Sequence, residues 1–160
     1  MYCFDIGHAA VDAGADLILG THAHMLKGME MYKGKAIFYS TGNFAIELGP
    51  GTIIGKTPIE ALKGMSQFYG FVPDPEYPTY PCHPEAKTTI IVKAVIEDGR
   101  IKTVSCIPCY VNKRAEPEIV TRQNPRGREV FDYISDISRS QGLAVDFSWE
   151  GDEVLIKPRS

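Results

Sequence analysis

Hydrophobic residues recur at helical spacing near the start of the chain and then give way to a short apolar run. The apolar positions between residues 4 and 13 are Phe4, Ile6, Ala9, Ala10 and Ala13. Gly14 follows, and glycine is typical of helix ends. Residues 15–20 are then predicted to form a strand, and the three consecutive apolar residues 17–19 are typical of a strand buried on both faces of a sheet. The pattern predicts an αβ unit.

Two further strands are predicted next, over residues 30–32 and 36–39, joined by a turn at residues 33–35. Residues 40–44 form a polar, glycine-containing corner after the second of them. Open α/β sheets tend to place their sites where strands end. Two strands therefore end in polar corners, one carrying His22 and His24 and the other carrying Asn43.

The C-terminal half predicts antiparallel pairing. Residues 87–96 alternate, with Ile90, Val92, Ala94 and Ile96 on one face. The pair at positions 98–99, Asp-Gly, is a strong hairpin signal, and residues 101–111 form the returning strand. A helix is predicted from residues 124–125 to about 141, and a last hairpin pairs residues 144–149 with 153–157. The fold class is therefore α/β, with α+β character in the C-terminal part, and residues 1–160 form a single domain.

Residues 46–86 interrupt this regular pattern as a loop rich in proline, glycine and aromatic residues. A short helix over residues 58–65 is the one regular element predicted there. The aromatic residues have two interpretations: rings that pin the loop to the core, which we favour, or a lid over the histidines. They are Phe68, Tyr69, Phe71, Tyr77 and Tyr80.

Composition narrows the classes of function. The 160 residues carry a net charge of -3, with Lys and Arg scattered, so no basic surface for nucleic acid is expected. No apolar run approaches the roughly 18 to 20 residues that a membrane span needs. The N-terminus enters an amphipathic pattern directly, and we expect that an earlier segment of the parent protein is missing.

The four cysteines do not suggest a disulfide framework. Cys106 and Cys109 have CxxC spacing, but they fall within a predicted strand, where positions three apart face opposite sides. We interpret them as structural. The alternative, a loop-borne zinc module on these two residues, remains open.

His22 and His24 are the candidate metal ligands. In extended backbone, residues two apart point the same way, so two imidazoles can reach one ion or two adjacent ions. The spacing alone is short enough to occur by chance, and the flanking sequence has to carry the assignment.

That flanking sequence, GADLILGTHAHMLKGMEMYKGKAIFYSTGNF over residues 14–44, resembles the C-terminal signature of the CapA family of bacterial capsule-synthesis proteins associated with poly-γ-glutamate. The resemblance covers about thirty residues. The family's fold is similar to that of the calcineurin-like metallophosphoesterases, a four-layer α/β sandwich with a two-metal centre, of which this chain would be the C-terminal half. Thr21 stands where relatives often carry a further histidine.

The resemblance implies that His22 and His24 ligate divalent metal ions, Mn, Fe or Zn, in a centre that is dinuclear in the intact parent. It makes Asn43 and Glu30 candidates for orienting a ligand or touching substrate. The superfamily's other ligand motifs do not precede His22 here, so we expect little or no catalysis from this chain alone. The parent would be a metal-dependent phosphoesterase-like hydrolase acting on a small molecule or an anionic polymer, with other capsule-synthesis proteins as partners.

A noncatalytic accessory or binding role in anionic polymer synthesis or export is the competing interpretation, because a fold does not fix an activity. The sequence is compatible with either a cytoplasmic or a surface-anchored parent.

Overall fold

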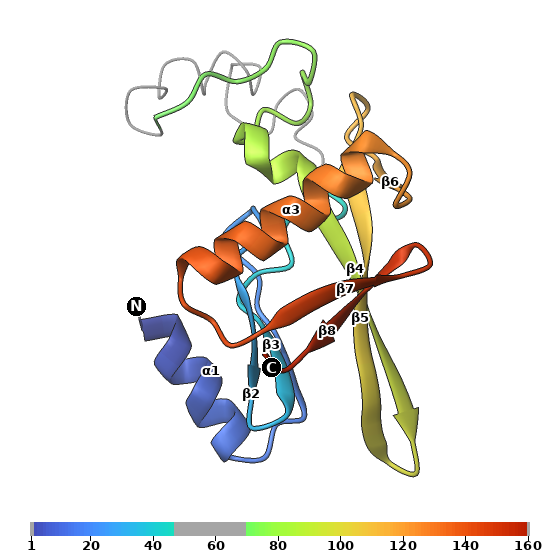
Figure 1. Cartoon of the computed structure of the whole chain (residues 1–160). Helices are drawn as coiled ribbons and strands as arrows, with labels where there is room; N and C mark the ends of the chain where they lie inside the picture. Colours follow the sequence, from blue (N-terminus) through green and yellow to red (C-terminus); the bar gives the residue numbers. More distant parts are fainter. Residues whose placement is uncertain (1, 47–69, 160) are drawn as a thin grey trace.

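The N-terminal helix and the first three strands form one unit (Figure 1). In the computed structural model, which describes residues 2–46 and 70–159, α1 (Tyr2–Asp12) leads into β1 (Leu17–Leu19), β2 (Met29–Tyr32) and β3 (Lys35–Phe38). The strand order is β1-β3-β2, with β1 parallel and β2 antiparallel to β3. The predicted αβ unit and the turn after β2 are confirmed. Lys33 and Gly34 both have positive φ in that turn.

Helix α1 lies close against one face of this sheet because it presents a glycine there. Gly7 is buried, and a Cβ at that position would lie 3.1 Å from the Tyr39 ring and 3.3 Å from Ile37. The ring of Phe4 packs edge-on against Tyr39, with centroids 4.7 Å apart. The close approach leaves Ile37 fully buried.

The prediction that residues 17–19 are buried on both faces is wrong. Leu17 packs against the core, but Leu19 is 52% exposed. β1 is an edge strand of the described sheet with a neighbouring strand on one side only, and burial falls along it from the half-buried Leu17 and Ile18 to Leu19 at its end.

The second sheet has the order β4-β5-β8-β7 and is antiparallel, as predicted. Its strands are β4 (Thr88–Glu97), β5 (Arg100–Val111), β7 (Asp146–Glu150) and β8 (Glu153–Lys157), and β6 (Pro117–Ile119) pairs with β5. Asp98 and Gly99 both have positive φ, as the hairpin turn requires. The predicted single apolar face does not persist to Ile96, which is 65% exposed, because the register shifts after Val95.

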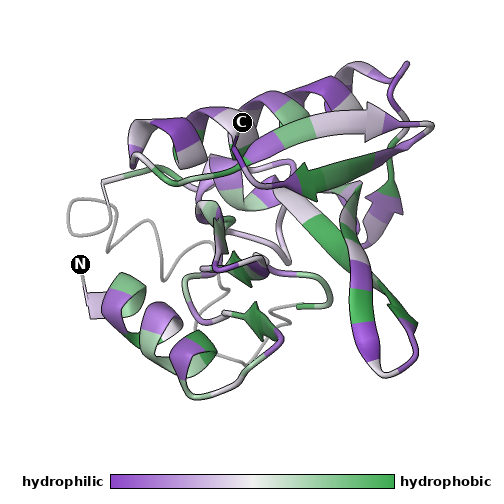
Figure 2. Cartoon of the chain, turned by 60° about the horizontal axis from the view of Figure 1, so that its bottom comes forward, coloured by the Kyte–Doolittle hydropathy of each residue, from purple (hydrophilic) through white to green (hydrophobic). Residues whose placement is uncertain are grey.

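Helix α3 (Pro125–Ser140) packs its apolar face into the core shared by the two sheets. The Asn124 side chain caps its first turn by accepting a hydrogen bond from the Arg126 backbone N–H, and Gly142 follows its end with φ of 69°. Val130 and Ile134 are fully buried. Most of the remaining helix surface is hydrophilic, as Figure 2 shows.

Ser138 joins α3 to the first sheet. Its hydroxyl accepts a hydrogen bond from the Met29 backbone N–H at 3.0 Å. The two sheets and α3 thus form one mixed α/β arrangement, which confirms the predicted fold class. Among residues 2–46 and 70–159, none of the helices is both long and apolar enough for a membrane span. The helix predicted over residues 58–65 lies outside the described residues.

Candidate metal-binding corner

The loops that follow β1 and β3 meet at one end of the first sheet. The Gly20 backbone N–H donates to Phe38 O at 2.7 Å, and its carbonyl accepts from the Thr41 N–H at 3.1 Å. Leu26 forms an antiparallel bridge with Thr41. The two polar corners predicted from the sequence therefore lie side by side, held by backbone hydrogen bonds.

His22 and His24 lie in the loop after β1, with ring centroids 6.0 Å apart and both residues exposed. With metal–nitrogen bonds of about 2.0–2.1 Å, two imidazoles at the tetrahedral angle of one ion would have centroids roughly 5 Å apart. The observed separation of 6.0 Å is wider, so the rings would have to move closer to share one ion, whereas two adjacent ions allow the wider spacing.

The backbone conformation that brings the two rings together differs from the predicted one. Extended backbone was predicted at the two histidines, but φ is 78° at His22 and 56° at His24. Non-glycine residues rarely adopt this left-handed conformation, which costs about 1–3 kcal/mol per residue and is concentrated at functional sites. A left-handed turn, rather than strand alternation, brings the rings together.

Asn43 holds His24 in place. The Asn43 Oδ1 atom lies 2.8 Å from His24 Nδ1, and the Asn43 Nδ2 group donates to the His24 backbone carbonyl at 3.2 Å. The side chain is buried, with 7% of its surface exposed. One predicted site residue thus contacts another at both ends of its amide.

The loop before β4 supplies the third side of the corner. Asn43 Nδ2 also donates to the Tyr80 hydroxyl at 2.9 Å, and Cys82 Sγ lies 3.8 Å from the same nitrogen. Tyr80 in turn donates to the Ala86 carbonyl at 2.7 Å. Burial raises the pKa of Tyr80 well above its usual range and also raises that of Cys82, so the hydroxyl stays protonated.

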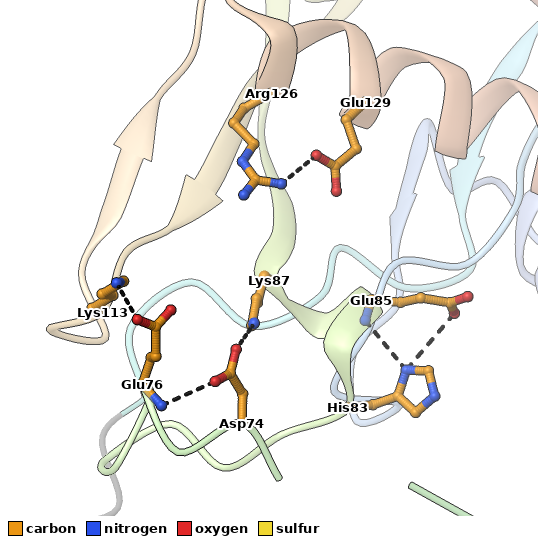
Figure 3. Close-up of polar contacts among 8 residues, drawn as sticks. All are labelled: Asp74, Glu76, His83, Glu85, Lys87, Lys113, Arg126 and Glu129. Atoms are coloured by element: carbon orange, nitrogen blue, oxygen red, sulfur yellow. Dashed lines mark hydrogen bonds and ion pairs between the residues drawn. The ribbon is translucent and has the colours of Figure 1, made fainter. Parts of the chain in front are cut away.

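Two of the loop aromatics are buried in the described part of this loop, as the favoured interpretation predicted, and ion pairs hold it as well. Tyr77 and Tyr80 belong to a small apolar cluster with Ala86. Asp74 pairs with Lys87 at 2.7 Å, and Glu76 pairs with Lys113 at 2.8 Å (Figure 3). Phe68 and Tyr69 lie outside the described residues. The loop ends in η1 (Pro84–Lys87), a 3-10 turn.

Glu30 lies in a separate network. On β2 it is buried, and its Oε2 atom accepts hydrogen bonds from His8 Nε2 at 2.9 Å and from the Tyr39 hydroxyl at 2.7 Å. The His8 ring stacks on Tyr32 with centroids 3.9 Å apart. Burial, and then the hydrogen bond to Glu30, raise the pKa of Tyr39 far above its usual range. The hydrogen bonds of Glu30 to His8 and Tyr39 join α1 to the sheet and involve neither His22 nor His24.

The cysteines at CxxC spacing lie within β5, as predicted. Cys106 and Cys109 are free and buried, and burial raises their pKa values to about 12 and about 11. Across the described part of the chain, no three His, Cys, Asp or Glu side chains gather in a group that could hold a metal ion. His22 and His24 thus offer two donors, which suit part of a metal centre and not a whole one.

Sequence reasoning missed two residues of these networks. His8 is one of them, because a single histidine in a helix has no sequence signal of its own. Tyr80 was grouped with the other loop aromatics, and its contact with Asn43 spans 37 positions of sequence. No local pattern reports a contact at that separation.

Comparison with known proteins gives a family match in the N-terminal segment. Residues 4–47 match the family model described as bacterial capsule synthesis protein PGA_cap. Over 44 residues the chain is 50% identical to the PGA biosynthesis protein CapA of Bacillus subtilis (strain 168) and to the capsule biosynthesis protein CapA of Bacillus anthracis. The match covers 28% of this chain, and 12% and 11% of those proteins. The uncharacterized protein y4sH of Sinorhizobium fredii is 56% identical over 34 residues, which are 21% of this chain and 7% of that protein.

Proposed function

We propose that this chain, whose residues 4–47 are related to the bacterial capsule synthesis proteins of the CapA family, carries the histidine arm of a divalent-metal centre in capsule or poly-γ-glutamate synthesis. The observation that carries the proposal is the pair of rings 6.0 Å apart on two left-handed residues. Non-glycine residues with strained backbone cluster at functional sites, and holding two imidazoles close together is a role that fits this pair.

The two imidazoles support Fe or Zn, because imidazole nitrogen suits these ions, and the resemblance to the superfamily adds Mn as a further candidate. In the superfamily that the sequence resembles, paired ions clamp a phosphoryl group and lower the pKa of bound water. The described residues contribute two donors, so the remaining ligands of a dinuclear centre would come from other residues. We assign no reaction step to this chain alone.

Each predicted site residue has a role in this proposal. His22 and His24 are the ligands. Asn43 orients His24. Histidines that bind metals are commonly oriented by a hydrogen-bond partner in this way. Glu30 positions α1 against the sheet through His8 and Tyr39. The whole protein would have the metallophosphoesterase sandwich and would hydrolyse a phosphoester bond in a small molecule or an anionic polymer, with other capsule-synthesis proteins as partners.

Zn²⁺ binding by the purified chain tests the histidine arm. Isothermal titration of the chain should detect one weak site that His24→Ala abolishes. His83→Ala is the matched control, because His83 is a partly exposed histidine that caps η1 and takes no part in the corner. If the His24→Ala variant bound Zn²⁺ as tightly as the unsubstituted chain, the assignment of His24 as a ligand would be refuted.

Hydrolysis is tested separately with a chromogenic phosphodiester and added Mn²⁺. We expect negligible turnover by this chain and metal-dependent turnover, lost in His24→Ala, by the complete gene product. A complete gene product that binds no metal would favour the accessory role in polymer synthesis or export. Robust turnover by this chain would contradict the incomplete donor set.

A further inference from the structure

We propose that Tyr80 is a positioning residue for the metal corner and that, through Asn43, it selects the ring tautomer of His24. The inference rests on the proposed function in one respect, the role of His24 as a metal ligand. The hydrogen bonds themselves involve no metal. Tyr80 lies outside residues 4–47, the segment shared with the capsule proteins. Nothing in that resemblance assigns it a role.

The direction of each hydrogen bond follows from the Ala86 carbonyl, the last group of this network. The Ala86 carbonyl can only accept, so the Tyr80 hydroxyl donates its single hydrogen to it, at 2.7 Å. The Tyr80 oxygen is then left as an acceptor. The group facing it, 2.9 Å away, is therefore the donating NH₂ of Asn43.

A second acceptor fixes the same amide. The His24 backbone carbonyl lies 3.2 Å from Asn43 Nδ2 and also can only accept. A flipped amide would place its oxygen against both Tyr80 and this carbonyl. With Nδ2 committed to these two partners, Asn43 Oδ1 is the atom that faces the His24 ring at 2.8 Å.

These hydrogen bonds determine the ring tautomer of His24. An amide oxygen only accepts, so His24 Nδ1 must carry the hydrogen and the neutral ring keeps its lone pair on Nε2. An imidazole binds a metal through an unprotonated nitrogen. The corner thus presents His24 with Nε2 ready to coordinate before any ion arrives. Tyr80 accepts the shortest of the hydrogen bonds that Asn43 Nδ2 donates.

Burial keeps this arrangement in one state. Tyr80 is 2% exposed and Asn43 is 7% exposed, so water cannot readily replace either partner. No buried side-chain nitrogen or oxygen of the described residues lacks a partner. A fully satisfied buried network specifies one arrangement of its members.

The experiment is long-range ¹H–¹⁵N NMR of the histidine rings in the metal-free chain at pH 8.5. The parent chain should show Nδ1 protonated and Nε2 unprotonated at His24. Tyr80→Phe removes the hydroxyl alone, and we expect the ratio of the two tautomers to move about fivefold toward Nε2–H, which corresponds to one net hydrogen bond of about 1 kcal/mol. Tyr77→Phe is the matched control, because it removes a hydroxyl from the same buried cluster, and the Asn43 side chain contacts His24, Tyr80 and Cys82 rather than Tyr77. This variant should leave the ratio unchanged.

Asn43→Leu keeps the test decisive if Tyr80→Phe folds poorly. It removes the accepting oxygen itself, so His24 should lose its preference for Nδ1–H. An Nε2–H tautomer in the parent chain, or equal ratios in Tyr80→Phe and Tyr77→Phe, would overturn the proposal. Because no metal is present, the tautomer result stands or falls independently of Zn²⁺ binding, and a confirmed tautomer with no Zn²⁺ binding would refute the proposed function alone.

Discussion

Gly20 is the position where one methyl group should most disturb the metal corner. It follows β1, and a Cβ there would lie 2.5 Å from Tyr39 O and 2.8 Å from Phe38 O. Those oxygens belong to backbone at the end of β3, and Phe38 O is the acceptor of the Gly20 N–H. Gly20→Ala must therefore push the end of β1 away from β3.

The expected cost follows from what the new methyl group meets. Overpacking typically costs about 1–3 kcal/mol when side chains can shift. Here the clashing atoms are backbone atoms within a hydrogen-bonded corner, so we expect a loss of about 3 kcal/mol in the free energy of unfolding. At about 2–4 °C per kcal/mol for a domain of this size, the melting temperature should fall by roughly 6–12 °C.

Urea denaturation followed by circular dichroism measures this loss, with Gly28→Ala as the matched control. A Cβ at Gly28 would also meet an atom at 2.5 Å, but that atom is the terminal Cδ1 of Leu143, which can rotate away. We expect Gly28→Ala to cost about 1 kcal/mol. If Gly20→Ala were no more destabilising than Gly28→Ala, the close backbone approach at the corner would be refuted.

Three further predictions test the networks around the corner. His22→Gly and His22→Ala both remove the imidazole, but His22→Gly should be more stable by about 1 kcal/mol in urea denaturation, because glycine tolerates the left-handed φ of 78°; equal stability would argue against strain there. Glu30→Leu should cost about 2–3 kcal/mol because it leaves the Tyr39 hydroxyl without its acceptor, and adding Tyr39→Phe should restore part of that loss in a double-mutant cycle; simple additivity would contradict the contact. The hydrogen-bonded ion pair with Lys87 lowers the pKa of Asp74 below its ordinary value of 3.8, so the stabilisation from this pair is present above that pH and is lost as the pH falls further. The difference in stability between the unsubstituted chain and Asp74→Asn should therefore narrow in acid. A difference independent of pH would contradict the pairing.

The elements predicted correctly carry strong local signals. Asp98-Gly99 and the turn after β2 place residues with positive φ where hairpins need them. Asn124 caps α3 with the side chain that its position predicts. The meeting of the two polar corners follows from parallel pairing of β1 with β3, which brings the ends of both strands to one edge of the sheet.

The features that could not be predicted depend on contacts between distant segments. The left-handed backbone at His22 and His24 has no clear signal in the local sequence, because neither position is a glycine. The exposure of Leu19 depends on which neighbours β1 has, and a three-residue apolar run does not encode them. The contact between Tyr80 and Asn43 likewise depends on the loop before β4 folding back onto the corner.

The measurement that most directly tests the assignment of His22 and His24 as metal ligands is a Zn²⁺ titration followed in the ring ¹⁵N signals of the four histidines. The signals of His22 and His24 should move together, with the Nε2 resonance of His24 changing most, while those of His8 and His83 stay in place. Movement of the His8 or His83 signals, with those of His22 and His24 unchanged, would contradict the assignment.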